Sequence, residues 1–273
     1  MPKVRPSEEP LGPFDHTPPE KVQLNNAPLA KVVCQVRWPE LTAFKQRFDA
    51  IAESIGTSIA GAYPLFDKRQ EQTFVVGTAG ISAAQGKTVY EWASADSRWH
   101  IHFGDTFLAI DTKRYTNKED LVERLGVVLT AVAEHVSIPS YNRIGYRYVN
   151  CVEATENVEL LIREEVRGGE AVPVRPGAEL IRTVTETLYR VDGDHLMARW
   201  AKLPSGVLID PGLPPLQSDS WILDLDAYNE SDEGEPFDPS QVAETATRLA
   251  GRGYSFFRWT VTPDFLAKFG VAK

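Results

Sequence analysis

The sequence contains 273 residues, of which 42% are hydrophobic, and it carries a net charge of −9. Such a chain is long and apolar enough to build a full core, either as one large domain or as two halves. The acidic balance argues against general binding to nucleic acid or to anionic membranes, because both require a basic surface.

Cysteine usage and apolar runs place further limits on the class of protein. Cys34 and Cys151 are too few for a disulfide framework, and we expect both to pack in the core. No apolar segment typical of a signal peptide follows Met1, and no run approaches the roughly 20 apolar residues of a membrane helix. We therefore expect a cytoplasmic protein that does not associate with a membrane, and nothing in the sequence indicates a cofactor.

Residues 1–26 predict a proline-rich, flexible arm. The prolines remove backbone donors and block helix formation, and they stand at Pro2, Pro6, Pro10, Pro13, Pro18 and Pro19. We expect extended or disordered chain, either as a free terminus or laid over the body of the protein or a neighbouring subunit.

The segment 27–138 predicts an N-terminal α+β half. Apolar residues recur at helix spacing from Leu41 to Ile59, and Asn117 can cap a second helix. Short turns at Gly80, Asp96-Ser97 and Gly104-Asp105 suit tight hairpins. We predict, in chain order, a strand over 30–38, a helix over 41–60, strands near 72–79, 86–95, 98–104 and 106–112, and a helix over 117–135.

The segment 139–273 predicts a C-terminal α+β half. Asp192-Gly193 is a strong hairpin signal, and Ser205-Gly206 is a second one. Asp238 or Ser240 can cap a late helix, and Pro263 stands near the start of a last one. We predict a strand over 143–153, an irregular part over 155–176 with a short helical piece near 157–166, strands near 178–191, 195–202, 205–210 and 219–227, an acidic loop over 229–239, and a helix over 240–252.

These elements define the expected fold class. Each half begins with a strand, continues through a helix or an irregular insert, and then has four strands and a helix. We predict an α+β fold with two pseudo-repeated halves, each an antiparallel meander with flanking helices, although the halves can also form one continuous domain.

The most informative segment is the predicted strand that contains Arg143 and Arg147. Its alternation places Ile144, Tyr146, Tyr148 and Asn150 on one face, and both arginines with Gly145 on the other. Two guanidiniums on one side of a strand, with an open position between them, are suited to an anionic group. A structural interpretation is equally direct, since arginines on a strand often pin a sheet through carboxylates.

Asp224 and Asp226 share a strand face and supply such carboxylates. They can neutralise Arg143 and Arg147 across the sheet, or the four side chains can line a polar pocket. In the pocket interpretation, Tyr148 and Asn150 help only if a bulge or the strand end turns them to the arginine side. The candidate ligand-binding residues are therefore Arg143, Arg147, Tyr148, Asn150, Asp224 and Asp226.

Two other motifs give weaker evidence for a functional site. His100 and His102 face one side of a strand and could bind a metal ion with Asp105 or Asp111, but no spacing fixes a third ligand, so we predict no metal site. Gly86-Lys87-Thr88 resembles the end of a phosphate-binding loop, yet Ile81 stands where the first glycine belongs, and a hairpin turn is the better interpretation.

Several segments together resemble a sporadically distributed family of uncharacterised bacterial proteins. The match spans about residues 24–270 and rests on Asn26-Ala-Pro-Leu29, Tyr63-Pro64, Trp92, Tyr115, the Arg-x-Gly-x-Arg-Tyr-x-Asn strand over 143–150, Asp224-Leu-Asp226 and the Phe-rich C-terminal segment. The resemblance implies no catalytic role. The patchy distribution of the family implies a mobile-element, phage-defence or toxin–antitoxin gene cluster, with a protein partner encoded nearby.

The functional prediction follows from architecture rather than from a catalytic motif. Antiparallel meanders with helices on one face leave an edge or a concave surface for a peptide or protein. We predict a non-enzymatic binding or assembly protein, with the arm and the acidic loop 229–239 as contact segments and a homo-oligomer as one form of assembly. The alternative is a ligand sensor or enzyme with an anion-binding arginine pocket. Nucleic acid is not an expected partner.

Overall fold

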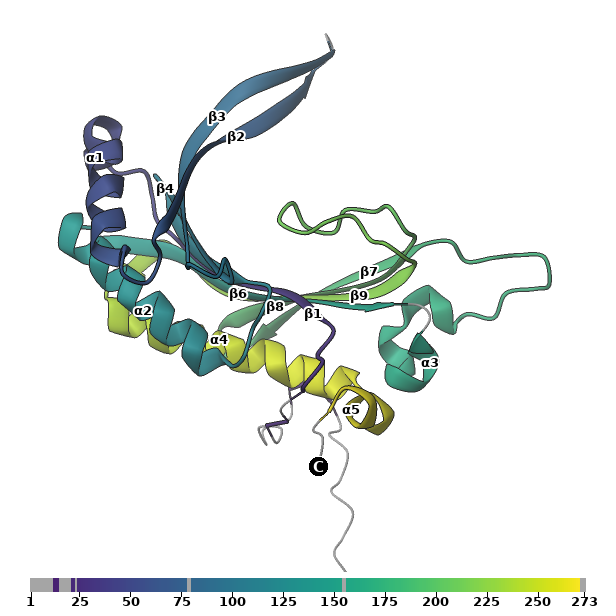
Figure 1. Cartoon of the computed structure of the whole chain (residues 1–273). Coiled ribbons are helices and arrows are strands. Elements are labelled where there is room, and N and C mark those ends of the chain that lie inside the picture. The colour runs from purple at the N-terminus through teal and green to yellow at the C-terminus, as the bar shows by residue number, and fades with distance from the viewer. Residues whose placement is uncertain (1–11, 15–20, 23, 78–79, 154–155, 271–273) are drawn as a thin grey trace, which may run out of the picture. The chain divides into compact units, whose positions relative to one another are not determined.

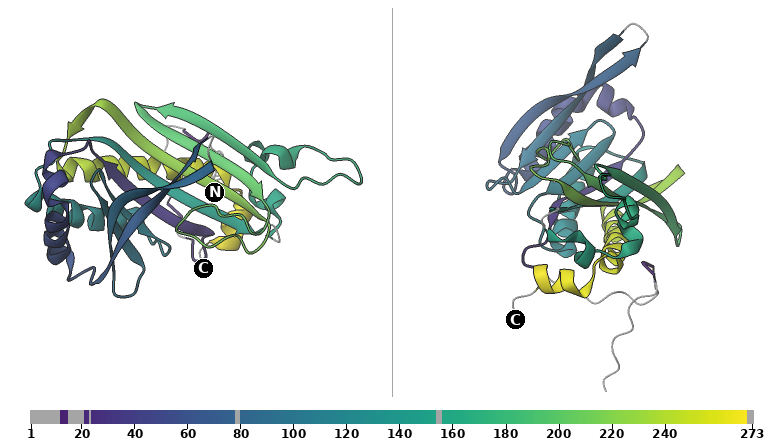
Figure 2. Two further views of the ribbon diagram at one scale, coloured as in Figure 1. Left: turned by 90° about the horizontal axis from the view of Figure 1, so that it is seen from above. Right: turned by 90° about the vertical axis from the view of Figure 1, so that its right-hand side faces the viewer.

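The computed structural model describes residues 12–14, 21–22, 24–77, 80–153 and 156–270. The chain divides into two compact units that are interleaved in sequence. Unit 1 comprises Met1–Ala30, Tyr148–Asp226 and Gly251–Lys273, and unit 2 comprises Lys31–Arg147 and Ala227–Ala250. Figures 1 and 2 show the elements of both units.

The fold is α+β, as the sequence predicts, and its strands form a nine-stranded antiparallel sheet. The strands follow the order β2-β3-β4-β5-β1-β6-β9-β8-β7. Their bounds are β1 Leu29–Arg37, β2 Leu65–Gly77, β3 Gly80–Ala93, β4 Trp99–Gly104, β5 Phe107–Thr112, β6 Ser140–Glu153, β7 Thr183–Val191, β8 Asp194–Leu203 and β9 Ser220–Pro236. The α-helices are α1 Thr42–Ile59, α2 Lys118–His135, α3 Val158–Leu161, α4 Pro239–Thr260 and α5 Pro263–Phe269, with short 3₁₀ turns at Glu164–Val166 and Gly168–Ala171.

In unit 2, helices α1 and α2 cover one face of the strands (Figure 1). Phe103 of β4 packs on Phe44 of α1 with 5.8 Å between ring centroids, and Trp99 of β4 lies beneath the Arg124 guanidinium of α2 at 4.7 Å. Trp99 and Phe103 are four residues apart on one strand and therefore share a face. The intervening His100 and His102 point to the opposite face of β4.

In unit 1, the β7–β8 hairpin packs against the C-terminal part of α4. The Phe256 ring of α4 lies 5.8 Å from the ring of Tyr189 in β7 and 6.4 Å from that of Trp200 in β8. Phe14 joins this aromatic group at 5.2 Å from Tyr189, and the Val22 N–H donates to the Tyr254 hydroxyl at 2.9 Å. The arm predicted over 1–26 lies mostly outside the described residues, but these two points of it are laid on the body of unit 1.

Local signals predicted several helix ends and turns correctly. The Asn117 side chain accepts a hydrogen bond from the Asp120 N–H at 2.8 Å, and Asp238 accepts one from the Gln241 N–H at 3.0 Å, so both caps are confirmed. Asp192-Gly193 joins β7 to β8 with φ values of 49° and 86°, which is the backbone of a two-residue hairpin turn.

The predicted acidic loop over 229–239 is wrong, because β9 continues to Pro236. Its acidic residues in this part are exposed, so strand pairing leaves their charges in water. Phe237 follows directly and packs on Trp38 with 6.0 Å between ring centroids, while its N–H donates to the Pro139 carbonyl at 3.3 Å. These tertiary contacts in unit 2 outweigh the weak strand propensity of the acidic residues.

The predicted strand over 205–210 is also wrong. This segment is an irregular loop in which Gly206 has φ 82° and donates its N–H to the Leu216 carbonyl at 2.8 Å. Pro211, Pro214 and Pro215 follow the segment directly, and proline cannot donate to a strand ladder. The loop instead packs Val207 and Ile209 on a small apolar cluster.

Other boundaries also differ from the prediction, and among them β6 starts earlier, at Ser140, and β7 later, at Thr183. Strands β2 and β3 start earlier and pair with each other along their length, and residues 78–79 lie outside the described residues. Helix α4 does not end at residue 252 but runs to Thr260. A Cβ on Gly253 would lie 2.9 Å from Cδ2 of Tyr148, so this glycine lets α4 approach β6 closely rather than ending the helix.

Both cysteines lie where the core prediction places them. Cys34 is fully buried on β1, and Cys151 packs partly buried against the cluster of Ala201, Leu203 and Ile222. Burial raises the pKa of the Cys151 thiol, although a hydrogen bond with Ser220 opposes the effect. Among the described residues, no helix has the length and apolar character needed to cross a membrane.

Candidate functional site

The arginine strand is β6, and its alternation is as predicted. Arg143 and Arg147 are half-buried, whereas Ile144, Tyr146 and Tyr148 are buried. The Arg143 guanidinium stacks over the Tyr228 ring of β9 at 4.6 Å from the centroid. This contact is a cation–π interaction, so Arg143 has an aromatic partner within unit 2.

Tyr148 and Asn150 have structural roles in unit 1. Tyr148 packs against Gly253 of α4, and the Asn150 amide donates to the Leu223 carbonyl of β9 at 3.2 Å. A buried amide that satisfies a backbone carbonyl stabilises the sheet and is costly to withdraw. Asn150 is therefore held by the sheet.

The two aspartates of the predicted pocket also belong to unit 1. Asp224 lies 3.6 Å from the Arg199 guanidinium of β8, and Arg199 in turn binds Glu186 of β7. Asp226 is half-buried on the same face of β9. Asp224 therefore has an arginine partner that the sequence did not identify, and its pairing with Arg143 or Arg147 stays a prediction.

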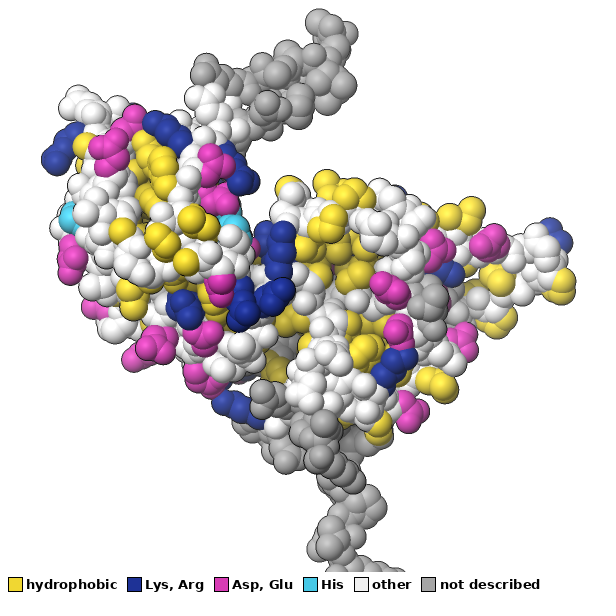
Figure 3. Space-filling view, viewed as in Figure 1, with side chains coloured by type: hydrophobic (Ala, Val, Ile, Leu, Met, Phe, Trp, Pro, Cys, Tyr) yellow, Lys and Arg dark blue, Asp and Glu magenta, His cyan; other side chains and the backbone are white. Residues whose placement is uncertain are grey.

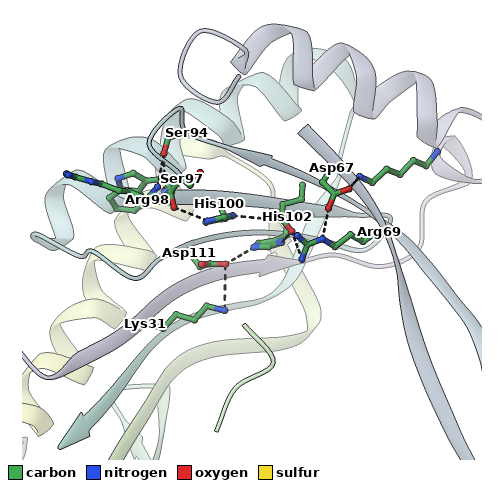
Figure 4. A network of polar contacts seen from close by, with 12 residues as sticks. Lys31, Asp67, Arg69, Ser94, Ser97, Arg98, His100, His102 and Asp111 are labelled. Carbon is green, nitrogen blue, oxygen red and sulfur yellow. Dashed lines mark hydrogen bonds and ion pairs between the residues drawn. The ribbon is translucent and has the colours of Figure 1, made fainter. Parts of the chain in front are cut away.

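A polar network crosses five strands of unit 2 (Figure 4). Asp111 of β5 is only 5% exposed and lies 2.6 Å from Nε2 of His102 and 3.7 Å from Nζ of Lys31. Glu91 of β3 is 8% exposed and lies 3.0 Å from Nδ1 of His100. Glu91 also lies 3.6 Å from Nδ1 of His102, so His102 links the two buried carboxylates on the face of β4 opposite α1 and α2.

Cations close both ends of this network. Arg69 of β2 lies 3.2 Å from Glu91 and 2.8 Å from Asp67, while Lys31 faces Asp111 at the other end. Figure 3 shows acidic and basic side chains intermixed over α1 and the base of the β2–β3 hairpin in this unit. Burial would raise the pKa of the Asp111 carboxyl, but the His102 hydrogen bond and the charges of His102 and Lys31 bring that pKa below its ordinary value.

His100 lies between two oxygen atoms of neighbouring residues. Its Nε2 is 3.2 Å from the Ser97 carbonyl oxygen, and its Nδ1 is 3.0 Å from a carboxylate oxygen of Glu91. Both ring nitrogens of His100 therefore have a partner in unit 2.

The network does not form a metal site. In the described part of the chain, no group of three or more His, Cys, Asp or Glu side chains is arranged to hold an ion. Asp105, a possible third ligand by sequence, instead binds Lys87 at 3.0 Å. Glu91, Lys31 and Arg69 were not identified from the sequence, because their contacts depend on strand register.

Lys87 lies within β3, and the hairpin turn predicted around Gly86-Lys87-Thr88 is wrong. Its ammonium bridges Glu40 at 3.1 Å and Asp105 at 3.0 Å. It borders a shallow cavity of about 160 Å³ whose apolar wall is formed by Leu41, Phe44 and Phe48. A lysine held by two carboxylates on a strand has no phosphate-binding loop around it.

The β7 strand forms one end of the strand order, and the left view of Figure 2 follows it along the margin of the sheet. The two-residue turn makes Val191 and Asp194 a hydrogen-bonded pair, and such pairs alternate along an antiparallel ladder. Odd-numbered residues from Thr183 to Val191 therefore direct their N–H and C=O groups at β8. The even-numbered residues direct theirs away from the sheet, and these are Val184, Glu186, Leu188 and Arg190.

The side chains of these four residues share one face of β7. Val184 is 46% exposed and Leu188 is 53% exposed, and Glu186 and Arg190 are also exposed. The opposite face is covered, since Gly168 and Gly169 approach the threonines at its start and aromatic rings cover Tyr189. Sequence reasoning predicted a strand here but did not identify it as an edge.

Comparison with known proteins gives no family for this chain. No model of a protein family matches it, and no curated protein matches it either. The resemblance to the sporadically distributed bacterial family therefore stays a prediction, and function has to be argued from the geometry of the two units.

Proposed function

We propose that the protein is a non-enzymatic binding or assembly protein that takes up an extended polypeptide segment along the β7 edge. The observation that carries this proposal is the row of backbone groups on Val184, Glu186, Leu188 and Arg190 that point away from β8. An added strand satisfies such groups in one step, which is the basis of peptide recognition by strand addition.

The side chains of this edge favour an ordered partner over indiscriminate pairing. Val184 and Leu188 provide exposed apolar contacts, whereas Glu186 and Arg190 place one charge of each sign between and beside them. Charges on edge strands prevent unselective association, because a wrong register buries an unpaired charge. Each backbone hydrogen bond contributes about 0.5–1.5 kcal/mol net, so a short paired segment supports a specific but moderate affinity.

Site-directed photo-crosslinking in cells tests the proposal. A photoreactive residue at Leu188 is expected to give a discrete crosslinked product, and one at Val127 of α2, which is 54% exposed, serves as the control position. Glu186→Pro removes an outward N–H, whereas Glu186→Ala keeps it and removes the same side chain. The product at residue 188 should disappear with Glu186→Pro and persist with Glu186→Ala; equal products in both variants would contradict the proposal.

We also infer that the two predicted halves are related by an internal repeat. The strand order supports this inference, since β5 lies beside β1 and β9 lies beside β6. Each half thereby places its first strand next to the last strand of its meander. Aligned relatives of the chain should have matching apolar positions in β1 and β6, and unrelated patterns there would count against a repeat.

A cytoplasmic location is part of the same proposal. Cell fractionation tests it, with recovery in the soluble cytoplasmic fraction as the expected result and recovery with membranes or in the medium as the contrary one.

A further inference from the structure

We propose that the partner on the β7 edge is a second copy of this chain, and that the two β7 strands pair antiparallel about a twofold axis at Leu188. This inference rests on the proposed function, because it names the partner of the same edge. Its basis is the order of side chains on the outward-directed residues: Val184, Glu186, Leu188 and Arg190.

A twofold axis at Leu188 gives a self-complementary pattern. Leu188 then lies opposite Leu188 of the second copy, and Glu186 lies opposite Arg190 of the second copy. Because the axis repeats every contact, the Glu186–Arg190 pair occurs twice and flanks the leucines on both sides. Directly opposite residues of an antiparallel pair are close enough for such contacts, and opposite charges there stabilise the pairing.

Neighbouring registers lack this complementarity. An axis at Glu186 brings two like charges together at the centre, which destabilises the pairing. An axis at Thr187 puts Glu186 opposite Leu188 and Val184 opposite Arg190, so each charge faces an apolar side chain. Among these three registers, only the axis at Leu188 pairs both charges and both leucines.

Within a single chain, the charged side chains of Glu186 and Arg190 are exposed and can reach a second copy. Arg190 is exposed and has no ion pair within the described part of the chain. Glu186 is also exposed and binds Arg199 of β8, its direct neighbour in the register. In the paired edge, Glu186 would lie between Arg199 of its own copy and Arg190 of the other, and one carboxylate can accept from both guanidiniums.

Charge exchange measured by sedimentation velocity tests the register directly. The full-length chain is examined over a dilution series as wild type, Glu186→Arg, Arg190→Glu and the double variant. Each single change places like charges opposite each other at two places, so the dimer dissociation constant should rise about tenfold or more. The double variant restores both opposite-charge pairs and should return to within about threefold of wild type.

Melting curves of all four proteins establish that each variant is folded, and Val127→Arg on α2 controls for a change of net charge alone. Weakening by both single variants with recovery in the double variant supports the pairing. A dimer dissociation constant that is the same in all variants would overturn the pairing. A double variant that dimerises more weakly than both single variants would also overturn it.

The crosslinking experiment separates this inference from the proposed function. A crosslink from residue 188 to another copy of the chain supports both. A wild-type chain that stays monomeric at every concentration, with a crosslink to a different protein that Glu186→Pro abolishes, overturns the second-copy partner and leaves strand addition intact. If no crosslink depends on the Glu186 N–H, both the second-copy partner and strand addition are overturned.

Discussion

Polar groups have partners within the sheet in the polar network of unit 2, whereas along the β7 edge of unit 1 they point outward. In the network, two buried carboxylates find imidazole and cationic partners on neighbouring strands at 2.6–3.7 Å. On β7, a row of backbone donors and acceptors points away from β8. The first set is satisfied by the fold, whereas the second has no backbone partner among the described residues.

Under the proposed function, this difference separates groups that stabilise the fold from groups that bind a partner. Paired histidines and carboxylates attract attention as a site, yet here each group binds another within the sheet. A buried network of this kind specifies register and is costly to break, because each remaining member then lies buried without its partner. The groups left outward by the fold are the better guide to binding.

The largest effect is expected when the network is broken at its most buried carboxylate. Asp111→Ala leaves Lys31 and His102 without their shared partner in the sheet. We expect a loss of about 3 kcal/mol in the free energy of unfolding, measured by urea denaturation. Asp67→Ala removes a largely exposed carboxylate of the same network, where water screens the ion pair with Arg69, and should cost much less than Asp111→Ala. Equal losses would mean that burial does not distinguish the two ends.

Proline substitution should produce the next largest effect and compares the two sides of β7. Thr187→Pro removes an N–H directed at β8 and leaves a ladder carbonyl unsatisfied, so we expect a loss of about 2–3 kcal/mol. Glu186→Pro removes an outward N–H and should cost less than about 1 kcal/mol in the monomer. Urea denaturation of dilute protein measures both, and the reverse order would show that the outward residues are the odd-numbered ones.

Acid titration should give a smaller change that reports on the network alone. Because the folded-state pKa of Asp111 is lowered, its carboxylate stabilises the protein fully above the unfolded pKa of about 3.9. That contribution is lost as pH falls through the folded pKa. The stability difference between wild type and Asp111→Ala should therefore shrink between pH 5 and pH 3, and a constant difference would contradict the assignment.

Local sequence signals predicted the parts of this fold that depend on near neighbours. The alternation around Arg143 and Arg147 identified β6, and Asn117 and Asp238 identified helix starts. The acidic end of β9 was missed because its contacts are with residues far away in sequence: Phe237 packs on Trp38, and Gly234 lies against Ser140. Glu91 was missed as a partner of His100 because their meeting depends on the register of β3 with β4. The edge position of β7 depends on the order of all the strands, which no local pattern contains.

The most direct test of the central claim is amide hydrogen exchange along β7, read residue by residue by NMR at low and high protein concentration. The amides of Thr185, Thr187 and Tyr189 should be protected at both concentrations, because they bond to β8. Those of Val184, Glu186, Leu188 and Arg190 should exchange fast in dilute protein and become protected as the edges pair. Protection of the even-numbered amides that does not change with concentration, or that never appears, would contradict β7 as the surface where copies of this chain associate.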